Sequence, residues 1–361
     1  MSSSLLPEAD GLAPEAALGR GSWVKWIGGA SNQDLAAIED LAGIYTLAGV
    51  HCLDVAADRG VVAAARRGID WAVERGAVRP WLMVSLSDGA DPHFRKAWFD
   101  PGLCPAHCPR PCERVCPAQA IGPAEGDAPG VRADRCYGCG RCLPACPPGL
   151  ISERQQLLPA RDVPRLLAEL QPDAVELHTR LGRGPAFQRR LEQLRESGVT
   201  LKRLAVSCGV EPAAGERETA GPADPVSLAA ELWQRFAMLR AAGFRPLWQL
   251  DGRPMSGDVG IGTAHSAVNL ARAVAASAPP GPLQLAGGTN AHTLVLLDGH
   301  PELAARVCGV AFGGTARRRL RPLLLQAQER GHGLLADDQL RPGALQSARE
   351  LVGPWLERRP R

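Results

Sequence analysis

Short apolar runs alternate with longer amphipathic segments along most of the 361-residue chain. The apolar runs have the length of buried strands, and the segments between them repeat with a helical period. The pattern predicts eight strands, at Val24–Gly28, Cys52–Ala56, Trp81–Leu86, Ala174–His178, Arg203–Cys208, Pro246–Leu250, Leu283–Ala286 and Cys308–Phe312. It predicts helices over Asn32–Leu47, Gly60–Glu74, Pro185–Ser197, Pro225–Ala242, Thr263–Ser277 and His300–Arg306, from near Ala316, and over Ala344–Leu356.

The spacing of these strands indicates an α/β fold, a (β/α)8 TIM-like barrel. Successive strands start about 25 to 43 residues apart, except after the third, where the interval is about 93 residues. The long interval predicts an inserted module. We therefore divide the chain into a flexible N-terminal segment (1–22), a first barrel part (23–90), an insert (91–158), and a second barrel part with C-terminal helices (159–361). An open doubly wound sheet is the alternative, but the strand count and the lack of a Gly-x-Gly-x-x-Gly motif after the first strand disfavour it.

Eight of the eleven cysteines lie in this insert. Its second half reads Cys136-x2-Cys139-x2-Cys142-x3-Cys146-Pro147, the bacterial-ferredoxin run for a [4Fe–4S] cluster. Three thiolates must reach one cubane from a short stretch, and Gly138 allows the loop to curl closely around it. A zinc site is the alternative, although zinc usually takes two separated Cys-x2-Cys pairs.

The first half of the insert reads Cys104-x3-Cys108-x3-Cys112-x3-Cys116-Pro117. Two of its gaps are one residue longer than in the ferredoxin run, and its prolines disfavour a continuous helix. The Cys-Pro ending followed by small apolar residues favours a second cluster motif. A degenerate run that binds nothing and a zinc site remain open.

In two-cluster ferredoxins the fourth cysteine of each run ligates the other cluster. This rule leads to a hypothesis of two ligand sets. They are Cys104, Cys108, Cys112 and Cys146 for one [4Fe–4S] cluster, and Cys136, Cys139, Cys142 and Cys116 for the other.

Glycine pairs follow the seventh and eighth strands, where many barrels hold a phosphate. The candidate cofactor-binding residues are Gly287, Gly288, Thr289, Gly313, Gly314, Thr315 and Arg317. A phosphate-bearing ligand such as FMN would fit this pattern, and so would tight turns with no ligand. His178 and Asp251 also close strands and could form an acid/base pair, although satisfying loop backbone is the more common role. The sequence assigns no catalytic residue.

Composition narrows the function classes. Hydrophobic residues make up 45% and charged residues 22%, which excludes disorder over most of the chain, and a net charge of +3 argues against a nucleic-acid partner. The first twenty residues lack the pattern of a signal peptide, and the longest uncharged run, Ala273–Leu297, contains prolines that a membrane span would not tolerate. We therefore expect a cytoplasmic protein, in which clustered cysteines bind metal before they form disulfides. Cys52, Cys208 and Cys308 lie in strand runs and are expected in the core.

The Gly-Gly-Ala-Ser stretch from Gly28, the run at Cys104–Pro117, the ferredoxin run at Cys136–Pro147 and the barrel pattern together resemble the cyanobacterial light-dependent period protein A family. The resemblance spans about Trp23 to Arg330. It implies an iron–sulfur protein of circadian clock input that reports redox state to clock-associated signalling proteins, with the eight clustered cysteines as ligands. It implies no catalytic residues.

Three functions compete. The first is a redox sensor and electron-transfer protein, which the resemblance favours over an enzyme. The second is a flavin- or phospholigand-dependent oxidoreductase fed by the ferredoxin module, which is weakened because no lysine closes a strand: Lys25 lies within the first and Lys202 precedes the fifth. The third is a barrel scaffold in which the clusters only fasten a loop.

Overall fold

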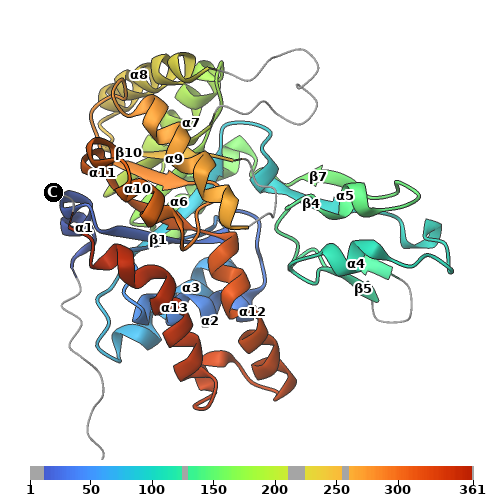
Figure 1. Ribbon diagram of the computed structural model, residues 1–361. Helices are drawn as coiled ribbons and strands as arrows, with labels where there is room; N and C mark the ends of the chain where they lie inside the picture. The colour runs from blue at the N-terminus through green and yellow to red at the C-terminus, as the bar shows by residue number, and fades with distance from the viewer. Residues whose placement is uncertain (1–11, 124–128, 210–223, 254–259, 360–361) are drawn as a thin grey trace, which may run out of the picture.

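Eight parallel strands close into a barrel surrounded by helices, with a smaller module projecting from one side (Figure 1). The computed structural model describes residues 12–123, 129–209, 224–253 and 260–359. The barrel order is β1-β2-β3-β8-β9-β10-β11-β12, and β12 pairs with β1 to close it. The barrel strands are β1 (Trp23–Gly29), β2 (Cys52–Ala56), β3 (Trp81–Ser87), β8 (Ala174–His178), β9 (Arg203–Cys208), β10 (Pro246–Asp251), β11 (Leu283–Ala286) and β12 (Val307–Phe312). The predicted barrel is thus confirmed.

The helices that cover the barrel follow its strands in the chain. They are α2 (Leu35–Leu47), α3 (Arg59–Val73), α6 (Val163–Leu170), α7 (Gly184–Glu196), α8 (Pro225–Ala242), α9 (Ala264–Val274), α10 (Thr293–Asp298), α11 (Pro301–Arg306) and α12 (Gly314–Glu329). A last helix, α13 (Arg341–Leu356), packs against α2, α12 and β1. The helical pattern missed α6 and α10, which are short helices of eight and six residues.

Alternate residues of each strand face opposite sides of the barrel wall. On β1, Val24 and Trp26 pack outward in the large core shared with the helices, which includes Tyr45 of α2. Trp23 faces inward, in a second core with residues that begin the other strands and with Cys52 and Cys308. Cys208 is buried in the outer core. The three cysteines outside the insert therefore lie in apolar cores.

Residues 12–22 correct the prediction of a flexible N-terminal segment. They contain helix α1 (Pro14–Arg20), which begins with a proline and ends at Gly21 in a left-handed conformation. Ala17 and Leu18 are buried against Trp23 and its neighbours and close the amino-terminal end of the barrel. The first eleven residues lie outside the described ones.

The inserted module leaves the barrel after β3 and returns before α6 (Figure 1). Its entry and exit, β4 (Arg95–Trp98) and β7 (Ser152–Gln155), form an antiparallel pair. Beyond this stem lie a second antiparallel pair, β5 (Ile121–Pro123) and β6 (Pro129–Val131), and two short helices, α4 (Pro111–Val115) and α5 (Cys142–Ala145). Phe99, Ile121 and Ile151 form a small core together with the cysteines.

Among the described helices, none has both the length and the apolar character needed to cross a membrane.

The buried His51 makes stability depend on pH. Its Nδ1 accepts the Val24 N–H at 3.1 Å, and burial lowers the pKa of the ring to about 4, from about 6.5 in an unfolded chain. Because the folded state resists protonation, His51 contributes full stability above about pH 6.5 and loses it as the pH falls towards 4, at a cost of about 3 kcal/mol.

The His51→Asn variant, whose amide oxygen can accept the same N–H, should lose less free energy of unfolding than the parent chain between about pH 6.5 and pH 4.5. Denaturant unfolding followed by circular dichroism at several pH values measures the difference. Equal losses in both proteins would contradict this assignment.

Candidate functional site: cysteine module and barrel mouth

The eight module cysteines lie in two groups. Electrostatic interactions link Cys142 with Cys139, Cys136 and Cys116, and link Cys146 with Cys104 and Cys112. We call the two sets cysteine group A and cysteine group B. Group A is Cys104, Cys108, Cys112 and Cys146, and group B is Cys116, Cys136, Cys139 and Cys142. Each group takes three cysteines from one run and one from the other, as the cross-ligation hypothesis expects.

Group B surrounds a small cavity lined by all four of its cysteines. Gly138 and Gly140 both have φ of +75°, and a Cβ on Gly138 would lie 2.3 Å from the carbonyl oxygen of Arg95. Arg95 also donates from Nε to the Gly138 carbonyl at 3.1 Å. Strand β4 therefore holds the loop in the tight curl that the chemistry requires.

The thiols of group B lie close enough together to influence one another's protonation. Burial, together with the thiols of Cys139, Cys136 and Cys116, raises the pKa of the Cys142 thiol to about 12. A raised pKa keeps a free thiol protonated, so thiolate ligands form here only when bound iron supplies the positive charge that replaces their protons, and the four thiols around one small cavity are the ligand set of one cluster. Backbone N–H groups of Ala97 and Ala120 donate to the sulfurs of Cys136 and Cys116, at 3.3 and 3.2 Å. Such hydrogen bonds tune cluster potentials.

Group A is less enclosed. Cys112 is buried in α4, whereas Cys104, Cys108 and Cys146 are half-buried. Burial is the main cause of the raised pKa of the Cys104 thiol, and the neighbouring thiols of Cys108 and Cys146 raise it further. This group therefore lies nearer to solvent than group B.

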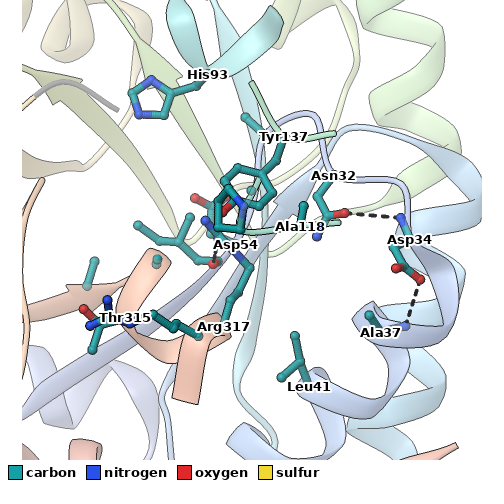
Figure 2. Close-up of a pocket in the computed structure, with 18 of the residues that line it drawn as sticks. Asn32, Asp34, Ala37, Leu41, Asp54, His93, Ala118, Tyr137, Thr315 and Arg317 are labelled. Atoms are coloured by element: carbon teal, nitrogen blue, oxygen red, sulfur yellow. Dashed lines mark hydrogen bonds between the residues drawn. The ribbon is translucent and has the colours of Figure 1, made fainter. Parts of the chain in front are cut away.

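A cavity of about 220 Å³ opens at the carboxyl ends of the barrel strands (Figure 2). Every candidate cofactor-binding residue from the sequence lines it: Gly287, Gly288, Thr289, Gly313, Gly314, Thr315 and Arg317. Tight packing also accounts for some of them. A Cβ on Gly287 would lie 2.6 Å from the carbonyl oxygen of Arg253, and the Thr315 hydroxyl donates to the carbonyl of Thr289 at 3.1 Å.

The cysteine module forms part of the wall of this cavity. Residues 117–119, which follow Cys116, line it, and so does Tyr137, which follows Cys136. The Arg317 guanidinium lies 4.4 Å from the centre of the Tyr137 ring, an arrangement visible in Figure 2, and donates to the carbonyl of Ile27 at 2.7 Å. Group B is thus connected through Tyr137 and Arg317 to the barrel.

A buried ion pair lies in the barrel interior below the cavity. Lys25 contacts Glu176 and lies 3.5 Å from Asp54, and all three side chains are excluded from solvent. Burial opposes the charge on Lys25, but the carboxylates of Glu176 and Asp54 raise its pKa. Burial and the nearby Glu176 raise the pKa of Asp54 to about 7. The lysine and Glu176 are therefore the charged pair at neutral pH.

The structure does not join His178 and Asp251 directly. His178 Nε2 lies 3.0 Å from Glu176 Oε1, and Asp251 Oδ2 accepts the Ser207 hydroxyl at 2.5 Å. Although burial opposes it, the hydrogen bond to Glu176 raises the pKa of His178 to about 9. Burial and the charge of Glu176 raise the pKa of Asp251 to about 6. Both side chains line the cavity. The charge of Glu176 raises the pKa of each.

Sequence reasoning missed Glu176, the ion pair of Lys25, and the pair Asp91 and His93. Lys25 and Glu176 each occupy the middle of an otherwise apolar, buried strand, a position that costs stability unless the charge is paired. That signal was present in the sequence. Asp91 and His93 carry no comparable signal, because they lie in the connection between β3 and β4.

Known proteins resemble the chain over nearly its full length. The family model described as "LdpA Fe-S cluster-binding domain" matches residues 104–157, and "Light dependent period A C-terminal domain" matches residues 166–354. A curated protein of Synechococcus elongatus, "Light dependent period A", is 46% identical over 348 residues, covering 94% of this chain and 93% of that protein.

Similarities to solved structures are weaker. Tryptophan synthase of Mycobacterium tuberculosis aligns with a TM-score of 0.45 at 10% identity, covering 94% of this chain and 95% of that one. Geranylgeranylglyceryl phosphate synthase of Thermoplasma acidophilum aligns with a TM-score of 0.37 at 13% identity, covering 94% and 99%.

Removing the buried lysine should destabilise the barrel. Lys25→Met leaves Glu176 and Asp54 buried without their cation and should lower the free energy of unfolding by about 3–5 kcal/mol. The same substitution at the exposed Lys202 should change it by less than about 0.5 kcal/mol. Denaturant unfolding of both variants measures the difference, and equal stabilities would show that the ion pair does not support the fold.

Proposed function

Because the chain belongs to the Light dependent period A family and carries its Fe–S cluster-binding domain, we propose that it is a redox sensor with two [4Fe–4S] clusters that signals to clock-associated proteins. The family resemblance drawn from the sequence is confirmed, and the chain is an iron–sulfur protein. The number and type of clusters, the sensing role and the partners are the proposal.

The division of the eight thiols into two groups of four supports two cubane clusters. Each cubane has four iron corners, and each group offers four cysteines. The cavity inside group B and the N–H groups that donate to two of its sulfurs are compatible with a cluster, whose potential such hydrogen bonds tune.

The contact between group B and the barrel carries the sensing proposal. Arg321 of α12 interacts electrostatically with Cys116 and Tyr137, and Arg317 stacks on Tyr137. A one-electron change at group B alters the local charge by one unit, and loss of the cluster frees the loop that carries Tyr137. Either event changes the contacts that Arg317 and Arg321 of α12 make with Tyr137 and Cys116. The surface around α12 is therefore the best candidate for redox-dependent recognition by a partner.

A second function, a flavin- or phospholigand-dependent oxidoreductase, is favoured by one observation. The glycine turns after β11 and β12 and the group B loop line the same cavity, so a bound FMN would lie beside a cluster. Lys25 does not supply the cation that a flavin ring prefers, because it is paired with Glu176. The visible spectrum of the anaerobically purified protein separates the two functions. Resolved flavin bands would favour the enzyme, and a broad brown shoulder alone favours the sensor.

Iron analysis tests the clusters and their ligand sets. The parent chain should contain about eight irons, and Cys142→Ser about four. Adding Cys146→Ser to Cys142→Ser should remove nearly all iron, since the two residues belong to different groups, whereas Cys112→Ser with Cys146→Ser should retain about four.

The core substitution Cys208→Ser is the matched control and should retain about eight irons. About four irons in the parent would contradict two clusters. About four irons in the Cys142→Ser, Cys146→Ser double variant would contradict the cross-ligation.

Partner capture tests the sensing role. Capture of clock-associated proteins from a cyanobacterial extract should weaken severalfold after air oxidation and in Cys142→Ser, because the loop that carries Tyr137 loses its cluster. Cys208→Ser should capture as the parent does. Unchanged capture by cluster-free protein would refute the sensor, and a potentiometric titration without any redox step would favour a structural role for the clusters.

A further inference from the structure

Two histidines and an aspartate converge where the module joins the barrel. Asp91 and His93 lie between β3 and β4, and His178 is the last residue of β8, the strand beside β3. One ligand atom from each lies within 4.8 Å of the others. No other group of three or more histidine, cysteine, aspartate or glutamate side chains in the described residues has ligand atoms this close together.

The two distances from Asp91 to the histidine rings lie below and above the distance between neighbouring ligand atoms of a metal site. His93 Nδ1 lies 2.7 Å and His178 Nδ1 lies 3.9 Å from the same oxygen, Oδ1 of Asp91. Ligands about 2.0–2.2 Å from a metal ion stand about 3 to 3.5 Å apart, so small side-chain rotations suffice. A hydrogen bond accounts for the shorter distance, between His93 Nδ1 and Asp91 Oδ1. The distance from His178 Nδ1 is too long for one.

Two of the three ligand candidates, His178 and Asp91, are oriented by a further partner. Glu176 Oε1 lies 3.0 Å from His178 Nε2 and so leaves Nδ1 turned towards Asp91. Arg180 lies 3.7 Å from Oδ2 of Asp91, while Oδ1 accepts the His93 backbone N–H at 2.9 Å and lies against the two imidazoles. A carboxylate on the far nitrogen of a histidine is the arrangement that orients and strengthens histidine ligands in metal proteins.

The site also has an open side. His93 and His178 line the barrel cavity, and Figure 2 shows His93 at the opposite end of the view from Leu41. Two imidazoles and one carboxylate with free positions are the ligand set of catalytic zinc and non-haem iron sites. We propose that Asp91, His93 and His178 bind a divalent transition-metal ion whose remaining coordination positions face the barrel cavity.

This ion is separate from the cysteine clusters. Its ligands are nitrogen and oxygen atoms, whereas group A and group B offer sulfur alone, and the two kinds of donor select different metals. Mn²⁺ is therefore a suitable probe, because it prefers nitrogen and oxygen ligands and leaves thiolate-bound clusters intact.

The test titrates the anaerobically purified, cluster-containing full chain with Mn²⁺ after treatment with EDTA and desalting. Free Mn²⁺ is followed by electron paramagnetic resonance. We expect one saturable site per chain, and Zn²⁺ should displace the Mn²⁺ because affinity increases from Mn²⁺ to Zn²⁺. Water-proton relaxation should show that the bound ion keeps exchangeable water, as an open site requires.

His93→Gln should weaken Mn²⁺ binding at least tenfold, and His178→Gln should do the same. The His93 ring is 28% exposed, so its replacement should leave the fold and the iron content unchanged. His265→Gln is the matched control on the exposed surface of α9 and should bind as the parent does. Equal affinity in His93→Gln and the parent, or no saturable binding by the parent, would overturn the proposal. A bound ion without exchangeable water would overturn its open coordination.

Discussion

The ion pair between Lys25 and Glu176 is the constraint around which the barrel interior is arranged. Burying these charges costs several kcal/mol each, and the cost is offset only when every charge and polar group finds a partner. Gln249 donates to Glu176 at 2.7 Å and accepts from Gln284 at 2.6 Å, and Gln284 in turn accepts from the Trp23 indole at 2.6 Å. Four strands, β1, β8, β10 and β11, thereby contribute to one polar layer between the apolar floor and the cavity.

This polar layer also determines the chemistry of the mouth. Glu176 reaches Lys25 on one side and His178 on the other, so one carboxylate both pairs with the lysine and orients the histidine ring. A purely apolar interior would cost less free energy to bury, but it would contain no carboxylate to orient the His178 ring. The barrel therefore resembles a binding site more than a scaffold in its interior, even though its outer wall is an ordinary apolar core.

Much of the fold was predictable because its signals are local. Strands such as Ala174–His178 are short apolar runs, and the cysteine spacing at Cys136–Cys146 defines a loop without reference to the rest of the chain. The sequence did not predict the features that depend on contacts between residues far apart in the chain. The helix at Pro14–Arg20 forms because the barrel floor covers its apolar side, and Asp91 meets His178 only because β3 pairs with β8. The sequence around Asp91 and around His178 contains no pattern that predicts this contact.

The stem of the module has a consequence for how the barrel closes. Gln156 donates its N–H to the carbonyl of Phe94 at 2.6 Å, so the chain enters and leaves the module at nearly one point. The strands β3 and β8 pair directly beneath it, and the barrel closes without any strand from the module. The pairing of the barrel strands therefore does not pass through the cluster-binding loops.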